Sequence, residues 1–170
     1  MLDNILNLLK KFIPKKLFMA LAPLYHYSLA LVGAIVFGFP SRSLTVIAVT
    51  GTKGKSSTTE MINSNLEADG QKTILLNTIR FKLGDNSTPN KTKMTAPGRF
   101  FLQKMLREGL SLGCTTAVIE LSSEAAKQYR HKFIYLDALV FTNLTPEHIE
   151  SHGSFENYKK SKLSLTESLG

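Results

Sequence analysis

Residues 49–59 read VTGTKGKSSTT and contain the residue types of a phosphate-binding loop. They follow a stretch typical of a strand and open a stretch typical of a helix, which is the context that a P-loop requires. Gly51 and Gly54 let the backbone turn tightly and present its N–H groups to phosphate oxygens. We expect Lys55 to neutralise the terminal phosphates and Ser56 to offer its hydroxyl to Mg²⁺. The predicted nucleotide-binding residues are Thr50, Gly51, Thr52, Lys53, Gly54, Lys55, Ser56 and Ser57.

A carboxylate, Glu120, stands at the carboxyl end of the apolar run TTAVIEL. Such a group is costly in a buried strand unless it meets a cation or takes up a proton. The Mg²⁺ of bound ATP is the natural partner, and a cap on a neighbouring helix is the alternative. Ser122 and Ser123 follow at positions where they can cap the next helix, and a substrate contact is compatible with that role.

The segment FTNLTPEHIESHGSFENYKKSK contains further polar candidates. Asn143 ends a predicted strand and points toward the ligand edge. His148 and His152 are four residues apart and could face the same way on a helix. A zinc site is disfavoured because it needs a third ligand and Gly153 is expected to break the turn.

Lys162 has an unusual place on the last predicted helix. It falls in the middle of an apolar stripe of helical period, formed by Phe155, Tyr158, Leu165 and Leu169. A lysine removed from water has a lowered pKa and becomes nucleophilic, so its amine can form a carbamate with carbon dioxide. The helical pattern alone favours a lysine whose stem packs while its amine reaches solvent.

Apolar runs rich in β-branched residues alternate with stretches long enough for helices. The runs are 44–50, 72–77, 115–121 and 136–142, and two of the helical stretches are 55–68 and 99–112. This alternation predicts an α/β fold with a parallel sheet covered by helices on both faces. Ligands of such sheets bind at the carboxyl ends of the strands, where all the polar clusters above lie.

The first forty residues differ from the rest, and we expect an apolar helical segment, 1–40, ahead of a domain at 41–170. One helix over 17–38 would reach about 33 Å, enough to cross a bilayer. A signal peptide is disfavoured because no small-residue cleavage site is present. A single span is disfavoured because it would place the phosphate loop and the preceding lysines on opposite sides of the membrane, although both are expected on the cytoplasmic side. These lysines are Lys10, Lys11, Lys15 and Lys16. We expect a helical hairpin that packs on the next domain or lies in the membrane surface.

Length and charge limit the function classes. A chain of 170 residues is the length of one domain, and its formal charge of +8 favours an anionic partner. Nucleic acid is the weakest such partner because the lysines are scattered and no aromatic platform accompanies them. Cys114 is the single cysteine, which fits a cytoplasmic location.

These segments resemble the Mur ligase family. The loop is similar to the family's shortened pattern T-G-T-x-G-K-[ST]-[ST]-T, and VIELSSEAAKQYR resembles E-x-S-S-H followed by arginine, with Glu124 in place of the histidine. MTAPGRFFLQKML is similar to the T-T-P segment, with Ala96 at the second threonine. TNLTPEH resembles T-N-[LV]-x-x-[DE]-H, which a carbamylated lysine follows in the family. The resemblance covers residues 44–165 and is strongest to the ligases that add diaminopimelate or lysine.

The resemblance implies a role for each matching residue. Lys162, carbamylated, and His148 would serve a second Mg²⁺, while Ser56 and Glu120 serve the first. Asn143 would lie near the γ-phosphate and act with Lys55, His148 and Lys162 in catalysis. The implied substrate contacts are Thr95, Ser122, Ser123 and Arg130.

The resemblance implies an ATP-dependent, Mg²⁺-requiring ligase of peptidoglycan precursor synthesis. Its substrates would be a UDP-MurNAc-peptide and an amino acid, joined through an acyl phosphate. We expect part of the family's central domain, with the carboxyl-terminal ligase domain missing, and therefore ATP binding without ligation. Two alternatives stay open: a folylpolyglutamate synthase or cyanophycin synthetase type of ligase, and a membrane-surface module with a relict nucleotide site.

Overall fold

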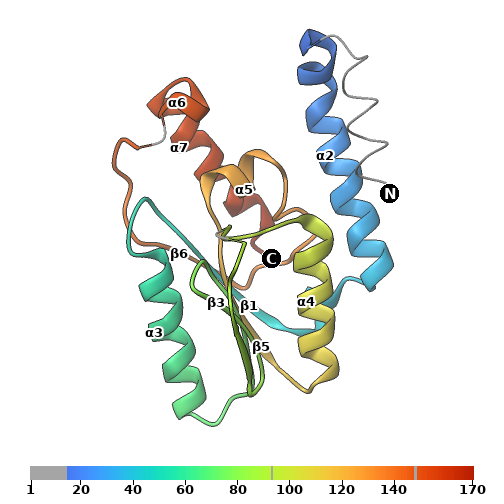
Figure 1. Cartoon of the computed structure of the whole chain (residues 1–170), viewed down its shortest axis with the longest axis vertical. Coiled ribbons are helices and arrows are strands. Elements are labelled where there is room, and N and C mark those ends of the chain that lie inside the picture. Colours follow the sequence, from blue (N-terminus) through green and yellow to red (C-terminus); the bar gives the residue numbers. More distant parts are fainter. Residues whose placement is uncertain (1–14, 93, 148) are drawn as a thin grey trace.

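The computed structural model describes residues 15–92, 94–147 and 149–170. Helices and strands alternate along most of this chain (Figure 1). The helices are α2 (Lys15–Phe37), α3 (Lys55–Ala68), α4 (Arg99–Ser111), α5 (Ser123–Lys127), α6 (Ile149–His152) and α7 (Phe155–Leu163), with 3₁₀ turns η1 (Pro40–Ser43) and η2 (Ser164–Ser168). The strands are β1 (Thr45–Thr50), β2 (Thr73–Leu76), β3 (Arg80–Leu83), β4 (Asn86–Pro89), β5 (Thr116–Glu120) and β6 (Ala138–Phe141).

The strands form one sheet in the order β4-β3-β2-β5-β1-β6. The four predicted apolar runs became β1, β2, β5 and β6, and their mutual pairings are parallel. The predicted parallel sheet is confirmed, and it carries in addition β3 and β4, which pair antiparallel at one edge. Every residue of β4 is exposed, so this hairpin has no apolar run that would mark it in the sequence.

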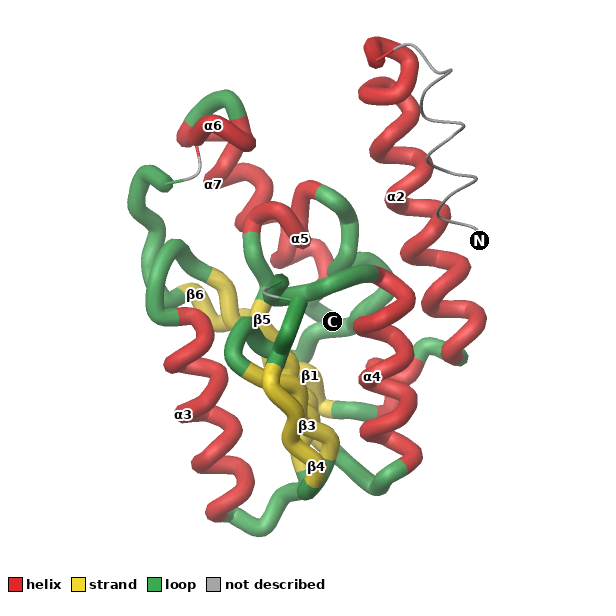
Figure 2. Tube along the Cα trace, in the orientation of Figure 1, coloured by secondary structure: helices red, strands yellow, loops and turns green. Residues whose placement is uncertain are grey.

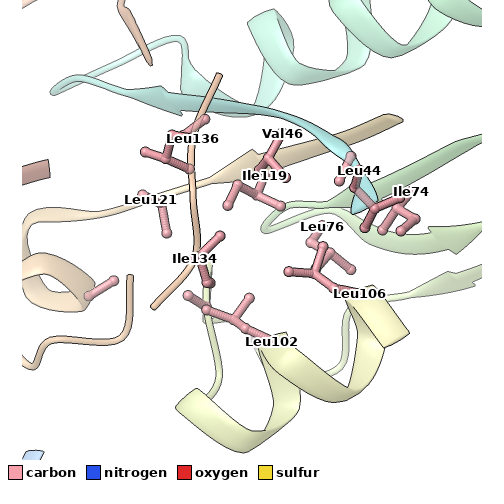
Figure 3. Packing of buried hydrophobic residues seen from close by; sticks show 14 of the residues in the cluster. Leu44, Val46, Ile74, Leu76, Leu102, Leu106, Ile119, Leu121, Ile134 and Leu136 are labelled. Atoms are coloured by element: carbon pink, nitrogen blue, oxygen red, sulfur yellow. The ribbon is translucent and has the colours of Figure 1, made fainter. Parts of the chain in front are cut away.

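Helices cover both faces of the sheet, as the sequence predicts. Figure 2 shows α3 on one side of the strands, and α4 with α2 on the other. Side chains alternate between the faces along each strand: Ile74 and Leu76 belong to the larger core cluster on the α4 side, whereas Leu75 belongs to the smaller cluster that packs against α3. Figure 3 shows the larger cluster, in which Leu102 and Leu106 of α4 face the strands.

The helix α2 packs on α4 through small side chains. Ala30 and Ala34 are buried, and a Cβ on Gly33 would lie 3.7 Å from the backbone of Phe100. Arg107 of α4 donates hydrogen bonds to the carbonyls of Phe37 and Gly38, which satisfies the carboxyl end of α2. The carboxyl end of α2 is therefore fixed to α4.

The expected hairpin over residues 1–40 stays a prediction. Its second arm is α2, which continues through Pro23, and its first arm lies outside the described residues. Within the described part of the chain, no helix is long and apolar enough to cross a membrane.

Candidate functional site

The glycine loop, residues 50–56, joins β1 to α3 and depends on two glycines. Gly51 has a φ of 146°, and a Cβ there would overlap the hydroxyl of Thr142. Gly54 has a φ of 80° and forms the N-cap of α3, with open space where a Cβ would stand. Both backbone conformations favour glycine, so the loop can bring its N–H groups close to a ligand at the helix amino terminus.

Asn143 braces this loop from the end of β6. Its Oδ1 accepts hydrogen bonds from the backbone N–H groups of Thr52 (3.2 Å) and Lys53 (3.0 Å), and its Nδ2 donates to the Lys53 carbonyl (3.0 Å). Thr142 Oγ1 donates to the same carbonyl (2.7 Å). The Asn143 amide therefore holds the loop in shape, and its expected contact with a γ-phosphate stays a prediction.

Ser56 and Glu120 lie together at the carboxyl edge of the sheet. Ser56 Oγ donates to Glu120 Oε2 (2.8 Å), which also accepts from the backbone N–H (3.0 Å) and hydroxyl (3.1 Å) of Thr78. Glu120 is 2% exposed. The alternative that this carboxylate caps a helix is wrong, because its partners are a side chain of α3 and the turn after β2.

Lys162 is buried, and the residue is 1% exposed. Its Nζ donates to the carbonyl of Gly51 (2.6 Å) and lies 4.9 Å from the centre of the Tyr158 ring. The pKa of Lys162 is lowered to about 8, chiefly by burial and also by the charge of Lys55, while Glu147 and Glu120 act in the opposite direction. The pattern-based alternative, an amine that reaches solvent, is wrong.

A hydrogen-bond network connects α7 to the glycine loop. Tyr158 is buried, and its hydroxyl lies 2.9 Å from Thr52 Oγ1. Thr52 Oγ1 accepts from the backbone N–H of Thr145 (3.0 Å). Burial raises the pKa of the Tyr158 hydroxyl. Thr52 therefore receives support from both α7 and the segment after β6.

One cavity of about 450 Å³ brings the loop and the predicted substrate residues together. Three cationic side chains, Lys55, Lys162 and Arg130, line it. The predicted substrate contacts in its wall are Thr95, Ser122, Ser123 and Arg130. The cavity therefore joins a phosphate-type loop to a wall that carries hydroxyls and a guanidinium, which suits an anionic ligand.

The wall after β5 is organised by local hydrogen bonds. Ser122 Oγ accepts from the backbone N–H of Ala125 (3.2 Å), so it caps α5 as expected. Glu124, which replaces the family histidine, accepts from Gln128 Nε2 (2.7 Å). Gln128 Oε1 in turn accepts from the guanidinium of Arg130 (2.7 Å), and burial lowers the pKa of Arg130. Glu124 is thus linked to Arg130 through Gln128.

The roles of the predicted site residues stay predictions. His148 lies outside the described residues, and its metal role stays a prediction. Ser57 is exposed on α3. Within the described ranges no group of three or more His, Cys, Asp or Glu could hold a metal, and Gly153, with a φ of 77°, separates α6 from α7 as predicted.

Residues 49–170 match the family described as Mur ligase middle domain. The chain belongs to the Mur ligase family. It is 38% identical over 149 residues to a UDP-N-acetylmuramyl-tripeptide synthetase of Roseiflexus sp. (strain RS-1), covering 86% of this chain and 29% of the relative. It is 36% identical to a UDP-N-acetylmuramoyl-L-alanyl-D-glutamate--2,6-diaminopimelate ligase of Halalkalibacterium halodurans, covering 84% and 29%.

Solved structures show the same fold. The structure of a UDP-N-acetylmuramoyl-L-alanyl-D-glutamate--2,6-diaminopimelate ligase superposes with a TM-score of 0.66 at 29% identity. The superposition covers 74% of this chain and 25% of that one. MurF of Acinetobacter baumannii superposes with a TM-score of 0.59 at 22% identity, which supports the fold alone. This Mur ligase chain spans less than a third of the length of the relatives cited.

The residues of this Mur ligase chain fit the Mg-ATP that the family uses. The Ser56 hydroxyl and the Glu120 carboxylate are oxygen donors of the kind that Mg²⁺ prefers. Lys55 Nζ donates to the loop's own carbonyl at Thr52 (2.9 Å), so an ammonium already stands beside the loop. The open space at Gly54 leaves the helix amino terminus accessible to phosphate.

Several residues of the site were not predicted. Thr78 binds Glu120, and Tyr158 supports Thr52, but neither stood out in the sequence. Thr78 could have been suspected, because it follows the predicted strand 72–77 and parallel strands end at one edge. Tyr158 belongs to an apolar stripe, where a tyrosine is ordinarily a core residue.

Proposed function

We propose that this chain binds Mg-ATP at the glycine loop and forms the ATP-binding part of a ligase of peptidoglycan precursor synthesis. The observation that supports this most is that Lys55 of the loop, Lys162 and Arg130 line one cavity, while Ser56, the residue after Lys55, donates to Glu120. Ser56, Glu120 and a carbamylated Lys162, with His148, are the proposed Mg²⁺ ligands.

The proposed reaction joins an amino acid to a UDP-MurNAc-peptide. A carboxylate of the peptide attacks the γ-phosphorus of ATP in line, the bond to ADP breaks, and an acyl phosphate forms. The amine of the amino acid then attacks the acyl carbon, a C–N bond forms, and inorganic phosphate leaves. Lys55 and the loop N–H groups stabilise charge on the transferring phosphoryl group, and Mg²⁺ neutralises the phosphates when bound. Arg130, Ser123 and Thr95 hold the anionic peptide.

The ATP part of this proposal is tested by calorimetry with Mg-ATP. Lys55→Ala is expected to weaken binding about 30-fold or more, since it removes the cation beside the loop. Lys104→Ala, at an exposed position of α4, is the matched control and is expected to bind as the wild type does. Absence of binding to the wild-type chain, or equal binding by Lys55→Ala, would contradict the proposal.

We further propose that the 170 residues bind ATP without completing ligation. The chain spans 29% of the two tripeptide-forming relatives cited. The test is mass spectrometry after incubation with Mg-ATP, UDP-MurNAc-L-Ala-D-Glu and either diaminopimelate or lysine. An amide product would overturn this part. Turnover of a folate or an aspartate polymer, and not of the muropeptide, would favour the related ligase types instead.

A second proposal concerns α2, which has an apolar face without a partner among the described residues. Seven large apolar side chains are exposed along the described part of this helix: Leu21, Leu24, Tyr25, Tyr27, Val32, Ile35 and Val36. Residues 17–41 carry no formal charge and four lysines precede them, a combination that suits an anionic membrane surface. We propose that α2 lies against such a surface.

Flotation with anionic liposomes tests the role of α2. The double variant Leu24→Glu/Ile35→Glu is expected to lose flotation, because two exposed apolar positions become anionic. Met61→Glu changes an equally exposed methionine on α3 and is expected to float as the wild type does. Equal flotation of the wild type and the double variant would remove the membrane idea.

A further inference from the structure

His152 connects α5, whose Ser123 lines the cavity, to α7. The ring is 8% exposed at the end of α6, and its Nε2 lies 3.1 Å from Ser123 Oγ in the α5 wall. Its Nδ1 lies 3.4 Å from Ser161 Oγ on α7, beside Lys162. The ring also contacts Tyr158 edge-on, with 5.4 Å between the ring centres. One imidazole therefore links the proposed substrate wall to the helix that carries Lys162.

The backbone around His152 is fixed. Asn157 Nδ2 donates to the His152 carbonyl (3.1 Å), and Ser154 Oγ accepts from the Asn157 N–H (3.2 Å) as the cap of α7. Lys127 of α5 donates to the carbonyl of Ser151 (2.5 Å). These bonds hold the ring in place, so the ring can determine how its hydroxyl partners are oriented.

A neutral imidazole has one donor nitrogen and one acceptor nitrogen, so two arrangements exist. With the proton on Nε2, the ring donates to Ser123 Oγ and accepts from the Ser161 hydroxyl. The Ser123 proton is then free to point into the cavity. With the proton on Nδ1, the Ser123 hydroxyl donates to the ring, and Ser123 can offer a ligand only an acceptor.

We propose that His152 is a positioning residue that carries its proton on Nε2 and thereby makes Ser123 a hydrogen-bond donor to an anionic oxygen of the substrate. The charge of the cavity selects this arrangement, because Lys55 and Arg130 both attract an anion. An anionic oxygen accepts hydrogen bonds and is repelled by an acceptor. The identity of the ligand, a muropeptide carboxylate, rests on the proposed function. The position of the proton on the His152 ring rests on the geometry alone.

The tautomer is tested directly by nitrogen-15 NMR of the histidine rings in the whole chain at pH 7.5. The chain has four histidines, and His152→Gln assigns the signals of His152 by their loss. The proposal expects a protonated Nε2 and an unprotonated Nδ1. The opposite pattern would overturn it, and this result does not depend on whether any ligand binds.

Binding variants test the consequence. UDP-MurNAc-L-Ala-D-Glu is titrated into each variant, and Mg-ATP is titrated separately. His152→Ala and Ser123→Ala are each expected to weaken muropeptide binding about 10-fold and to leave Mg-ATP binding within about 2-fold. The double variant is expected to bind no more weakly than either single variant, because both changes remove the same hydrogen bond. Additive losses would show that His152 does not act through Ser123.

A conservative variant separates positioning from packing. The amide of His152→Gln can place an N–H near the position of Nε2, so its muropeptide affinity is expected within about 3-fold of the wild type. Glu156→Gln, at an exposed position of α7, is the matched control. If His152→Gln lost as much affinity as His152→Ala, the role of the ring would be structural and the proposal wrong. Absence of muropeptide binding by the wild type would instead contradict the proposed substrate. The NMR measurement of the His152 tautomer would still test the position of the ring proton.

Discussion

Two buried basic side chains, Lys162 and His131, lie in regions that differ in their polar surroundings. Lys162 is on α7, and its amine has the Gly51 carbonyl as acceptor and the Tyr158 ring beneath it. His131 follows α5 and is 0% exposed, and neither ring nitrogen has a hydrogen-bond partner of ordinary geometry among the described residues. Burial lowers the pKa of both groups, to about 8 for Lys162 and about 4 for His131.

The comparison shows that a shifted pKa alone does not mark a functional group. The Lys162 amine donates to the glycine loop and lines the cavity, whereas the buried His131 ring is not among the residues that line it. The charge of Lys132 also lowers the pKa of His131, while Glu167 and the Ala125 backbone favour the charged ring. We therefore expect substitution of His131 to change the stability of the chain and leave Mg-ATP binding unchanged, and substitution of Lys162 to weaken Mg-ATP binding.

The largest expected effect is the loss of stability in acid through His131. Its pKa is about 4 in the folded chain against about 6.5 unfolded, so the unfolded state binds more protons between these values. The free energy of unfolding therefore falls as pH falls from 6.5 to 4, by about 3 kcal/mol from this group. Urea unfolding followed by circular dichroism should show a fall of about 2 kcal/mol in the free energy of unfolding between pH 7 and 5. This window lies above the pKa values of ordinary carboxylates.

Two substitutions at this position separate the causes. His131→Leu is expected to remove the acid-dependent loss and to leave Mg-ATP binding unchanged. His131→Gln cannot titrate but keeps a buried polar group, so its stability should be low and independent of pH in this window. A wild-type slope retained in both variants would show that another group is responsible.

The second effect is the loss of nucleotide binding through Lys162. In the chain with a free Lys162 amine, Lys162→Met removes the charge-assisted hydrogen bond to Gly51, an interaction of about 1.5–3 kcal/mol. In the carbamylated chain it removes a proposed Mg²⁺ ligand. We therefore expect Mg-ATP binding to weaken about 10- to 100-fold in calorimetry. Lys160→Met, at an exposed position of the same helix, is the matched control and should bind normally. If the two variants bound ATP equally well, the loop would not depend on the buried amine.

Much of the fold was predictable because its elements have local signals. Four apolar runs rich in β-branched residues predict strands, and each contains one strand of the sheet. The runs are 44–50, 72–77, 115–121 and 136–142. The hairpin of β3 and β4 was missed because an edge hairpin is held by pairing to β2, and its exposed residues need no apolar pattern.

The site was predictable where one segment carries the chemistry. The glycine loop and the place of Lys162 in an apolar stripe can both be recognised within about a dozen residues. The bonds of Thr78 to Glu120 and of Ser123 to His152 join positions 42 and 29 apart in the chain. Such pairs depend on how strands and helices meet in space, which residue spacing does not encode.

The smallest expected effect comes from Lys53, an exposed cation of the glycine loop. Its side chain is 77% exposed, and Nζ lies 3.8 Å from Glu147 Oε1, so the ion pair is screened by water and salt. Lys53→Asn is expected to change the free energy of unfolding by less than about 0.5 kcal/mol. Mg-ATP binding should change by less than about 3-fold, because Asn143 holds the backbone of residue 53 whatever its side chain. A loss above about 10-fold that grows at low salt would show that the Lys53 ammonium contacts phosphate, and that an exposed cation in this loop matters as much as the buried one.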